Sequence, residues 1–216
     1  MCAILGFTSP SLKKEQVLPY FEKTKSRGPD DTRLEPAGSG MLGFHRLAIM
    51  GLHPEGMQPF HRGGDMAVCN GELYGFRPVK KALEAKGYVF ASDSDCEIIL
   101  PLWQEYGTEM FAGLDAEFAM IIYDSASDSL VAARDPIGIR PLFYGYLADG
   151  SIIFASEAKN LVGLCTHVFP FPPGHYYKDG KFVRYTDLTT VTRYSSDDLD
   201  TVTKKIREKL ISAVEK

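Results

Sequence analysis

Short apolar segments of strand length, separated by turn residues, fill the first 185 residues of this chain. Such segments between Gly, Pro, Asn and Asp clusters are typical of β-strands. The dipeptides Asp149-Gly150 and Asp179-Gly180 are typical of two-residue hairpin turns, which join antiparallel strands. We therefore expect a mainly antiparallel β protein with few helices, and strands at residues 3–7, 41–49, 65–70, 88–90, 117–123, 129–134, 142–147, 151–156 and in a hairpin over 175–185.

Helical periodicity appears in three segments of this region, residues 13–25, 77–86 and 95–106. Gly87 and Gly107 follow the second and third, where glycine can adopt the left-handed conformation that ends a helix. Prolines at positions 19 and 101 leave the helix boundaries open.

A last helix is predicted near the end of the chain. Ser195 and Asp198 resemble a capping box, and apolar residues then recur at helical spacing: Leu199, Val202, Ile206, Leu210 and Val214. The apolar stripe needs a partner surface, and no helix-ending residue precedes Lys216. We expect the chain to be part of a longer protein.

Charge and composition exclude several classes of function. With 24 Lys and Arg against 28 Asp and Glu, the net charge is −4, and no long basic cluster favours nucleic acid. No signal peptide or membrane-spanning run is visible, so we expect a cytoplasmic protein that binds no membrane. The four cysteines are scattered and no histidine stands at ligand spacing, which predicts reduced thiols and no metal site.

Cys2 has two interpretations. A buried cysteine usually acts as a small apolar residue. At position two, however, removal of Met1 would leave a residue that carries both a thiol and an α-amine with a pKa of about 7.7 to 8.0. That amine could serve as the general base for the thiol of the same residue.

Several motifs follow Cys2 in a fixed order and span nearly the whole chain. They are Met1 to Phe7 (MCAILGF), Arg27-Gly28-Pro29-Asp30, Phe44-His45-Arg46-Leu47, Met57-Gln58-Pro59, Asn70-Gly71-Glu72-Leu73-Tyr74, Ser94-Asp95-Cys96-Glu97, Arg134-Asp135-Pro136, Arg140-Pro141-Leu142, Ser156-Glu157-Ala158-Lys159 and Pro173-Gly174-His175. This series resembles the class II glutamine amidotransferases, and among them the glutaminase half of glutamine-hydrolysing asparagine synthetases.

The resemblance implies an α+β fold, the four-layer αββα sandwich of N-terminal-nucleophile hydrolases with two antiparallel sheets. It also implies two parts: a glutaminase domain over residues 1–190, and a linker with the start of a truncated C-terminal synthetase domain over residues 191–216. The substrate would be L-glutamine, hydrolysed to glutamate and ammonia through a γ-glutamyl thioester on Cys2, with no metal or organic cofactor.

The resemblance also assigns the groups that bind glutamine. Arg46 would take the α-carboxylate by a two-pronged hydrogen bond, although a surface arginine in a weak ion pair is the ordinary alternative. The next four residues, Leu47, Ala48, Ile49 and Met50, would form a wall along the substrate. Asp95 and Glu72 would bind the α-ammonium, although Asp95 also suits a helix N-terminus.

Asn70 and Gly71 would form the oxyanion hole. The Asn side-chain amide and the Gly backbone N–H would donate to the oxygen of the tetrahedral intermediate. Asn-Gly alone is an ordinary turn signal, and we expect these residues to close a turn after the strand at 65–70.

Other motif residues have structural explanations. We expect Arg27 and Arg134 to brace loops through carboxylates, His45 to be structural, and Cys69 to point into the core, because it alternates with Asn70. Gly75 stands where this family commonly has Asn, and Ala3 where it commonly has Gly.

No Ser-Gly-Gly-x-Asp-Ser pyrophosphate loop occurs in this sequence. ATP, Mg²⁺ and the ammonia acceptor, aspartate, would therefore belong to a C-terminal synthetase domain outside the chain, and a homodimer is possible. Two alternatives stay open: the glutaminase domain of another class II enzyme, such as a phosphoribosyl-pyrophosphate amidotransferase, and a non-catalytic domain that binds glutamine or docks to a partner.

Overall fold

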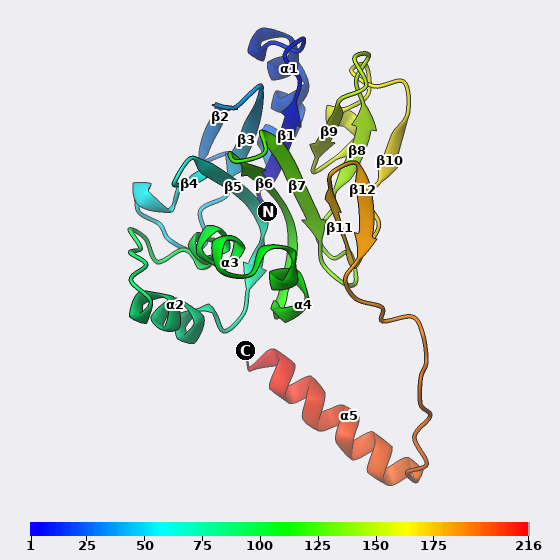
Figure 1. Ribbon diagram of the computed structural model, residues 1–216. Helices are drawn as coiled ribbons and strands as arrows, with labels where there is room; N and C mark the ends of the chain where they lie inside the picture. The colour runs from blue at the N-terminus through cyan, green and yellow to red at the C-terminus, as the bar shows by residue number, and fades with distance from the viewer. Residues whose placement is uncertain (216) are drawn as a thin grey trace. The chain divides into compact units, whose positions relative to one another are not determined.

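The structure is a computed structural model that describes residues 1–215. The chain divides into two compact units, Met1–Thr186 and Asp187–Lys216. The first unit holds two six-stranded sheets in which all paired strands are antiparallel (Figure 1). One sheet has the order β10-β8-β9-β1-β3-β2, formed by Val168–Pro170, Phe143–Tyr146, Ile152–Ala155, Ala3–Thr8, Gly40–Arg46 and Asp31–Ala37. The other has the order β12-β11-β7-β6-β5-β4, formed by Lys181–Arg184, His175–Lys178, Ser129–Arg134, Ala116–Asp124, Asp65–Leu73 and Phe60–Arg62.

Three apolar cores separate four layers. The central core lies between the sheets and joins residues such as Ile4 of β1 and Phe44 of β3 to Val68 of β5 and Ile121 of β6. Alternate residues of the same strands point outward, since side chains in a strand alternate between faces. Leu5 therefore packs on α1 (Lys14–Phe21), while the outer face of β5 packs under the helices α2 to α4. The predicted αββα sandwich is confirmed.

The helices of the first unit follow the three predicted segments, the first and third with shorter bounds and the second shifted by one residue, and a single-turn fourth helix was not expected. The α-helices are α1, α2 (Phe76–Ala85), α3 (Ile99–Tyr106) and the single turn α4 (Met110–Gly113). A 3₁₀ segment at Glu22–Arg27 extends α1, and another at Asp95–Ile98 (η3) precedes α3. Gly87 and Gly107 have φ of +95° and +53°, so both take the positive φ expected where these helices end.

Several expected elements were wrong. Residues 88–90 form no strand, and β2, β4 and β10 were not expected. The predicted strand at 41–49 ends at Arg46, so residues 47–49 lie in a loop. Most important, β5 continues to Leu73, so Asn70 and Gly71 lie inside the strand and close no turn. Both residues pair with β6, Asn70 opposite Ala119 and Gly71 opposite Phe118.

One of the two predicted two-residue hairpin turns is confirmed, and the other is wrong. Between β8 and β9, Leu147 pairs with Ser151, so the turn has three residues, and of Asp149 and Gly150 only Gly150 has a positive φ, of +84°. Asp179 and Gly180 have φ of +50° and +77° and join β11 to β12, as expected for the turns that match the twist of paired strands.

Gly75, which precedes α2, has φ of +62°. Asn and Gly are the residues that accept this conformation best, so Gly in place of Asn preserves the local backbone.

The second unit carries α5 (Leu199–Val214), which confirms the predicted last helix. Its N-cap is Asp198, whose carboxylate accepts a hydrogen bond from the N–H of Thr201; Ser195 is not the cap. Among residues 1–215, no helix combines the length and the apolar character that a membrane crossing needs. The assignment of residues 191–216 to a linker and a synthetase domain stays a prediction.

Candidate active site

The site is built on an open edge of β5. The neighbouring strand β4 pairs only with the first part of β5, from Asp65 to Ala67. Further along, β5 has only β6 as a partner, and Gly71 lies opposite Phe118. On the far side of β6, the carbonyl of Phe118 accepts from the N–H of Asp135, and the N–H of Phe118 donates to the Asp135 carboxylate. Because backbone groups alternate sides along a strand, the N–H groups of Cys69, Gly71 and Leu73 point to the open edge.

Side chains satisfy two of these three N–H groups. The Gln58 amide accepts from the N–H of Cys69 at 2.6 Å and donates to its carbonyl at 3.2 Å. The Asp95 carboxylate accepts from the N–H of Leu73 at 2.7 Å. Gly71 lies between them and lines a cavity of about 120 Å³. Its N–H therefore faces the cavity as a donor for a bound group.

Cys2 lies at the start of β1, where the predicted nucleophile should be. Its Sγ is 3.3 Å from the N of Leu47 and 3.6 Å from the Leu47 carbonyl oxygen. The guanidinium of Arg27 donates from Nε to the Cys2 carbonyl at 3.1 Å and from Nη1 to Glu157 at 2.8 Å. Arg27 thus braces through a carboxylate, as predicted, and what it holds in place is the backbone of Cys2.

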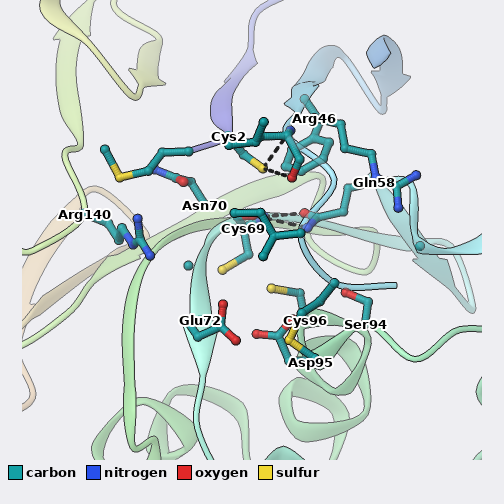
Figure 2. Close-up of a pocket in the computed structure, with 17 residues that line it drawn as sticks. Cys2, Arg46, Gln58, Cys69, Asn70, Glu72, Ser94, Asp95, Cys96 and Arg140 are labelled. Atoms are coloured by element: carbon teal, nitrogen blue, oxygen red, sulfur yellow. Dashed lines mark hydrogen bonds between the residues drawn. The ribbon is translucent and has the colours of Figure 1, made fainter. Parts of the chain in front are cut away.

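The same cavity brings together most residues that the sequence indicated (Figure 2). Its lining includes Cys2, Arg46, Leu47, Ile49, Met50, Asn70, Gly71, Glu72 and Asp95. Ala48 is the exception among the predicted site residues: it does not line the cavity, and its N–H donates to Asp30 at 2.8 Å. Asp30 thereby fixes the loop after β3, and Ala48 contributes to the site through that loop only.

Asn70 presents a second unused donor. Its Nδ2 is buried, and within residues 1–215 it has no hydrogen-bond partner. Asn70 shares its face of β5 with Val68, which packs in the central core that Cys2 also contacts. A buried amide without a partner costs about 1–3 kcal/mol, so a ligand oxygen that accepts from it would relieve that cost.

Arg46 ends β3 with its side chain buried at 7% exposure. Its guanidinium donates to the carbonyl oxygens of Gly51 and His53. In the part of the chain that the structure describes, no carboxylate pairs with Arg46, which excludes the ordinary ion-pair explanation. A positive charge with only carbonyl partners can accept an anionic ligand group in the cavity.

Two acidic side chains, those of Glu72 and Asp95, also line the cavity. Figure 2 shows the carboxylates of Glu72 and Asp95 turned toward one another. Burial raises the pKa of both groups, and for Glu72 the charge of Asp95 raises it further. For Asp95, the hydrogen bond from Leu73 acts in the opposite direction. Because an added cation would stabilise both carboxylates, the pair suits an ammonium group.

Sequence reasoning missed several lining residues, chiefly Arg140, Gln58, Ser94 and Cys96. Arg140 and Gln58 stand in motifs that were recognised, but nothing in the spacing showed that their side chains reach the cavity. Cys69 packs in the outer core, as predicted, and also lines the cavity. His45 is structural: it stacks on Phe21 at 3.8 Å between ring centroids. Within residues 1–215, no group of three or more His, Cys, Asp or Glu could hold a metal ion.

The electrostatics of Cys2 predict how its thiol reacts. Burial raises the pKa of the Cys2 thiol, although the Leu47 N–H and the positive N-terminal amine lower it. Since the thiolate is the reactive form, alkylation of Cys2 in a chain that retains Met1 should keep rising with pH above about 8.5, the ordinary thiol value. Intact-mass measurements of the rate of alkylation by iodoacetamide check this, with the rate for N-acetylcysteine at each pH as the reference. A plateau below the pH at which N-acetylcysteine levels off would contradict it.

Comparison with known proteins places this site in a family. A family model described as a glutamine amidotransferase domain matches residues 1–176. A probable glutamine-hydrolyzing asparagine synthetase of Dictyostelium discoideum is 38% identical over 194 residues, which cover 86% of this chain and 35% of that protein. An asparagine synthetase of Sandersonia aurantiaca is 39% identical over 188 residues, covering 85% and 35%. The chain thus spans about a third of the length of these relatives.

Solved structures share the fold. A glutamine phosphoribosylpyrophosphate amidotransferase of B. subtilis superposes with a TM-score of 0.67 at 20% identity, covering 86% of this chain and 49% of that one. An allosteric regulatory enzyme of purine biosynthesis gives a TM-score of 0.68, also at 20% identity, covering 89% and 50%. With the family model matched over most of the chain and the site in place, the chain belongs to the glutamine amidotransferase domain family.

Proposed function

We propose that this chain hydrolyses L-glutamine to glutamate and ammonia, with Cys2 as the nucleophile. The observation that carries the proposal is the pair of unused donors beside Cys2: the buried Asn70 Nδ2 and the Gly71 N–H on the open edge of β5. Donors held in place before the reaction stabilise an oxyanion without reorganising during it. A purely structural pocket has no need to leave them without partners.

The reaction follows from this arrangement. The Cys2 sulfur attacks the side-chain carbonyl carbon of glutamine, and the carbonyl oxygen becomes an oxyanion that accepts from Asn70 and Gly71. The α-amine of Cys2 takes the thiol proton and delivers it to the leaving nitrogen, so ammonia departs and a γ-glutamyl thioester remains. Water then attacks the thioester, with the same amine as base, and releases glutamate.

Met1 must be removed before this chemistry. Met1 lines the cavity, and while it remains, the amine of Cys2 is part of a peptide bond and cannot act as a base. Its removal would free the amine and enlarge the cavity beside the sulfur. Cysteine is small enough for this processing.

Substrate recognition depends on the two charged groups of the glutamine α-carbon. Arg46, alongside Leu47, Ile49 and Met50, binds the α-carboxylate, and Glu72 and Asp95 bind the neighbouring α-ammonium, so that the side-chain amide extends toward Cys2. No metal or organic cofactor is needed for these steps. In this assignment, Ala48 contributes only through the position of its backbone in the loop after β3.

The ammonia acceptor lies outside this chain. Relatives named glutamine-hydrolyzing asparagine synthetases are the basis for proposing that the ammonia serves ATP- and Mg²⁺-dependent amidation of aspartate in a cytoplasmic synthetase. The phosphoribosylpyrophosphate amidotransferase of similar fold is only 20% identical in sequence. The sequence therefore favours aspartate as the ammonia acceptor. The unused donors argue against a non-catalytic module.

The nucleophile is tested by substitution. Cys2→Ala should abolish ammonia release while glutamine still binds, because the sulfur forms the thioester and the binding groups are elsewhere. Ammonia release and isothermal titration calorimetry measure the two properties. Cys165→Ala is the matched control, since Cys165 does not line the cavity, and it should retain full activity. Persistent turnover by the Cys2 variant would show that another residue is the nucleophile.

The oxyanion hole is tested at Asn70. Asn70→Ala should lower kcat by about 10²- to 10³-fold, the usual effect of removing one such donor, with little change in glutamine affinity. The Asn70 Nδ2 has no hydrogen-bond partner to lose within residues 1–215, so thermal stability should fall little. Steady-state kinetics and thermal unfolding check both points. An unchanged kcat would remove Asn70 from the mechanism.

A further inference from the structure

Two carboxylates face each other where β5 meets β6. In the antiparallel register, Glu72 lies directly opposite Glu117. Side chains in such a position lie about 5 Å apart at Cβ, and like charges there destabilise the pair of strands. Glu72 also faces Asp95 across the cavity. Three acidic groups therefore gather in the part of the cavity that binds the substrate ammonium in the proposed function.

Arg140 is the cation among them. Its Nη2 donates to Glu117 at 2.5 Å, and the two side chains are only 14% and 20% exposed. Arg140 lines the cavity together with Cys2 and Glu72, on the side away from Arg46 and Gln58 in Figure 2. Its Nε is buried and has no hydrogen-bond partner within residues 1–215. Arg140 therefore pairs with Glu117 and also lines the cavity, where its positive charge lowers the pKa of Glu72.

A rigid loop holds Arg140 in this place. The carboxylate of Asp135 accepts hydrogen bonds from four consecutive N–H groups, those of Ile137, Gly138, Ile139 and Arg140. The guanidinium of Arg134 holds the loop from the other side, at the carbonyls of Gly138 and Arg140. Asp135 also bonds Phe118, next to Glu117. The loop therefore fixes Arg140 relative to the strand that carries Glu117.

We propose that Arg140 is a positioning residue for the ammonium site: by pairing with Glu117, it leaves Glu72 as an ionised carboxylate facing the substrate. The inference rests on the proposed function and adds to it a requirement that the motif residues alone did not indicate. Arg140 touches neither reacting atom. It acts through Glu117 and Glu72.

The charged groups around Glu72 set the direction of the pH effect. Asp95 from η3 and Glu117 from β6 raise the pKa of Glu72, as does burial, and Arg140 lowers it. The other titratable groups nearby include the thiols of Cys2 and Cys96 and the Tyr74 hydroxyl, whose pKa values are raised, so they carry no charge near neutrality. Without Arg140 the pKa of Glu72 rises further. Glu72 then takes up a proton at a higher pH, and the ammonium loses its partner there.

The experiment measures glutamine binding by calorimetry in the Cys2→Ala background, from about pH 5.5 to about pH 7, below the ordinary α-amine pKa of about 7.7 to 8.0, so that glutamine keeps its ammonium. With Arg140 in place, affinity should change little across this range. Arg140→Gln should weaken binding at the acid end by about tenfold or more, the value of a charged hydrogen bond, and approach the parent affinity as pH rises. Arg140→Lys, which keeps the charge, should retain most of the parent profile.

Rescue distinguishes positioning from a structural role. Glu117→Gln combined with Arg140→Gln removes both members of the pair, and binding at the acid end should recover relative to Arg140→Gln alone. Arg33→Gln is the matched control, because Arg33 forms an exposed pair with Glu35 away from the cavity, and it should leave the profile unchanged. Thermal unfolding of each variant reports folding separately.

A second ligand isolates the ammonium. Glutaramic acid, which is glutamine without its α-amine, should lose no affinity in Arg140→Gln. A profile for Arg140→Gln that matches the parent, an equal loss for glutaramic acid, or no recovery in the double variant would overturn the inference while leaving the proposed function intact. Failure of the Cys2→Ala parent to bind glutamine at any pH would instead overturn the proposed function.

Discussion

The open edge of β5 is the constraint on which this site depends. Because β4 ends its pairing at Ala67, the backbone N–H groups further along β5 have no strand to receive them. Buried backbone donors require partners, and here side chains from separate segments provide them. Gln58 serves Cys69 and Asp95 serves Leu73, while Gly71 between them is left for a ligand. In the proposed mechanism, β5 thus also provides a donor to the oxyanion.

Glycine at position 71 has a packing reason as well as a chemical one. A Cβ there would lie 2.6 Å from the Glu117 carbonyl oxygen and 2.9 Å from the Phe118 Cβ. The strands therefore approach closely at the point where the donors are placed. Cys2 reaches this point because β1 packs on the central core, while Arg27 and the loop after β3 hold its backbone and sulfur. Cys2 and the donors of β5 come from opposite sheets, so the packing between the sheets sets the distance between them.

Much of the site could be predicted from the sequence, because the functional residues stand in ordered motifs. Cys2, Arg46, Asn70 and Asp95 are recognisable by type and position, and the structure brings them to one cavity. The backbone around them was harder to predict. Asn-Gly is a strong turn signal, yet Asn70 and Gly71 are extended because they pair with β6. That pairing depends on the sheet and cannot be predicted from the dipeptide.

The remaining errors have similar causes. Residues 31–37 include charged side chains and Pro36, so the segment lacks a strand pattern, but it forms the edge strand β2, where proline is tolerated. Arg140 follows Arg134 and Asp135, for which the sequence indicated only a structural role in a loop. Its importance depends on the register that sets Glu72 against Glu117, and register is a property of two strands that neither sequence segment specifies alone.

The central claim is that Cys2 carries the γ-glutamyl group during turnover, and it can be tested by direct observation of that intermediate. The processed chain, lacking Met1, is mixed with glutamine, quenched in acid during steady turnover, and analysed by intact mass and peptide mapping. The account predicts a fraction of chains heavier by glutamine less ammonia, with the added mass on the Cys2 peptide. Release of ammonia with no such species, or with the adduct on Cys69 or Cys96, would contradict it.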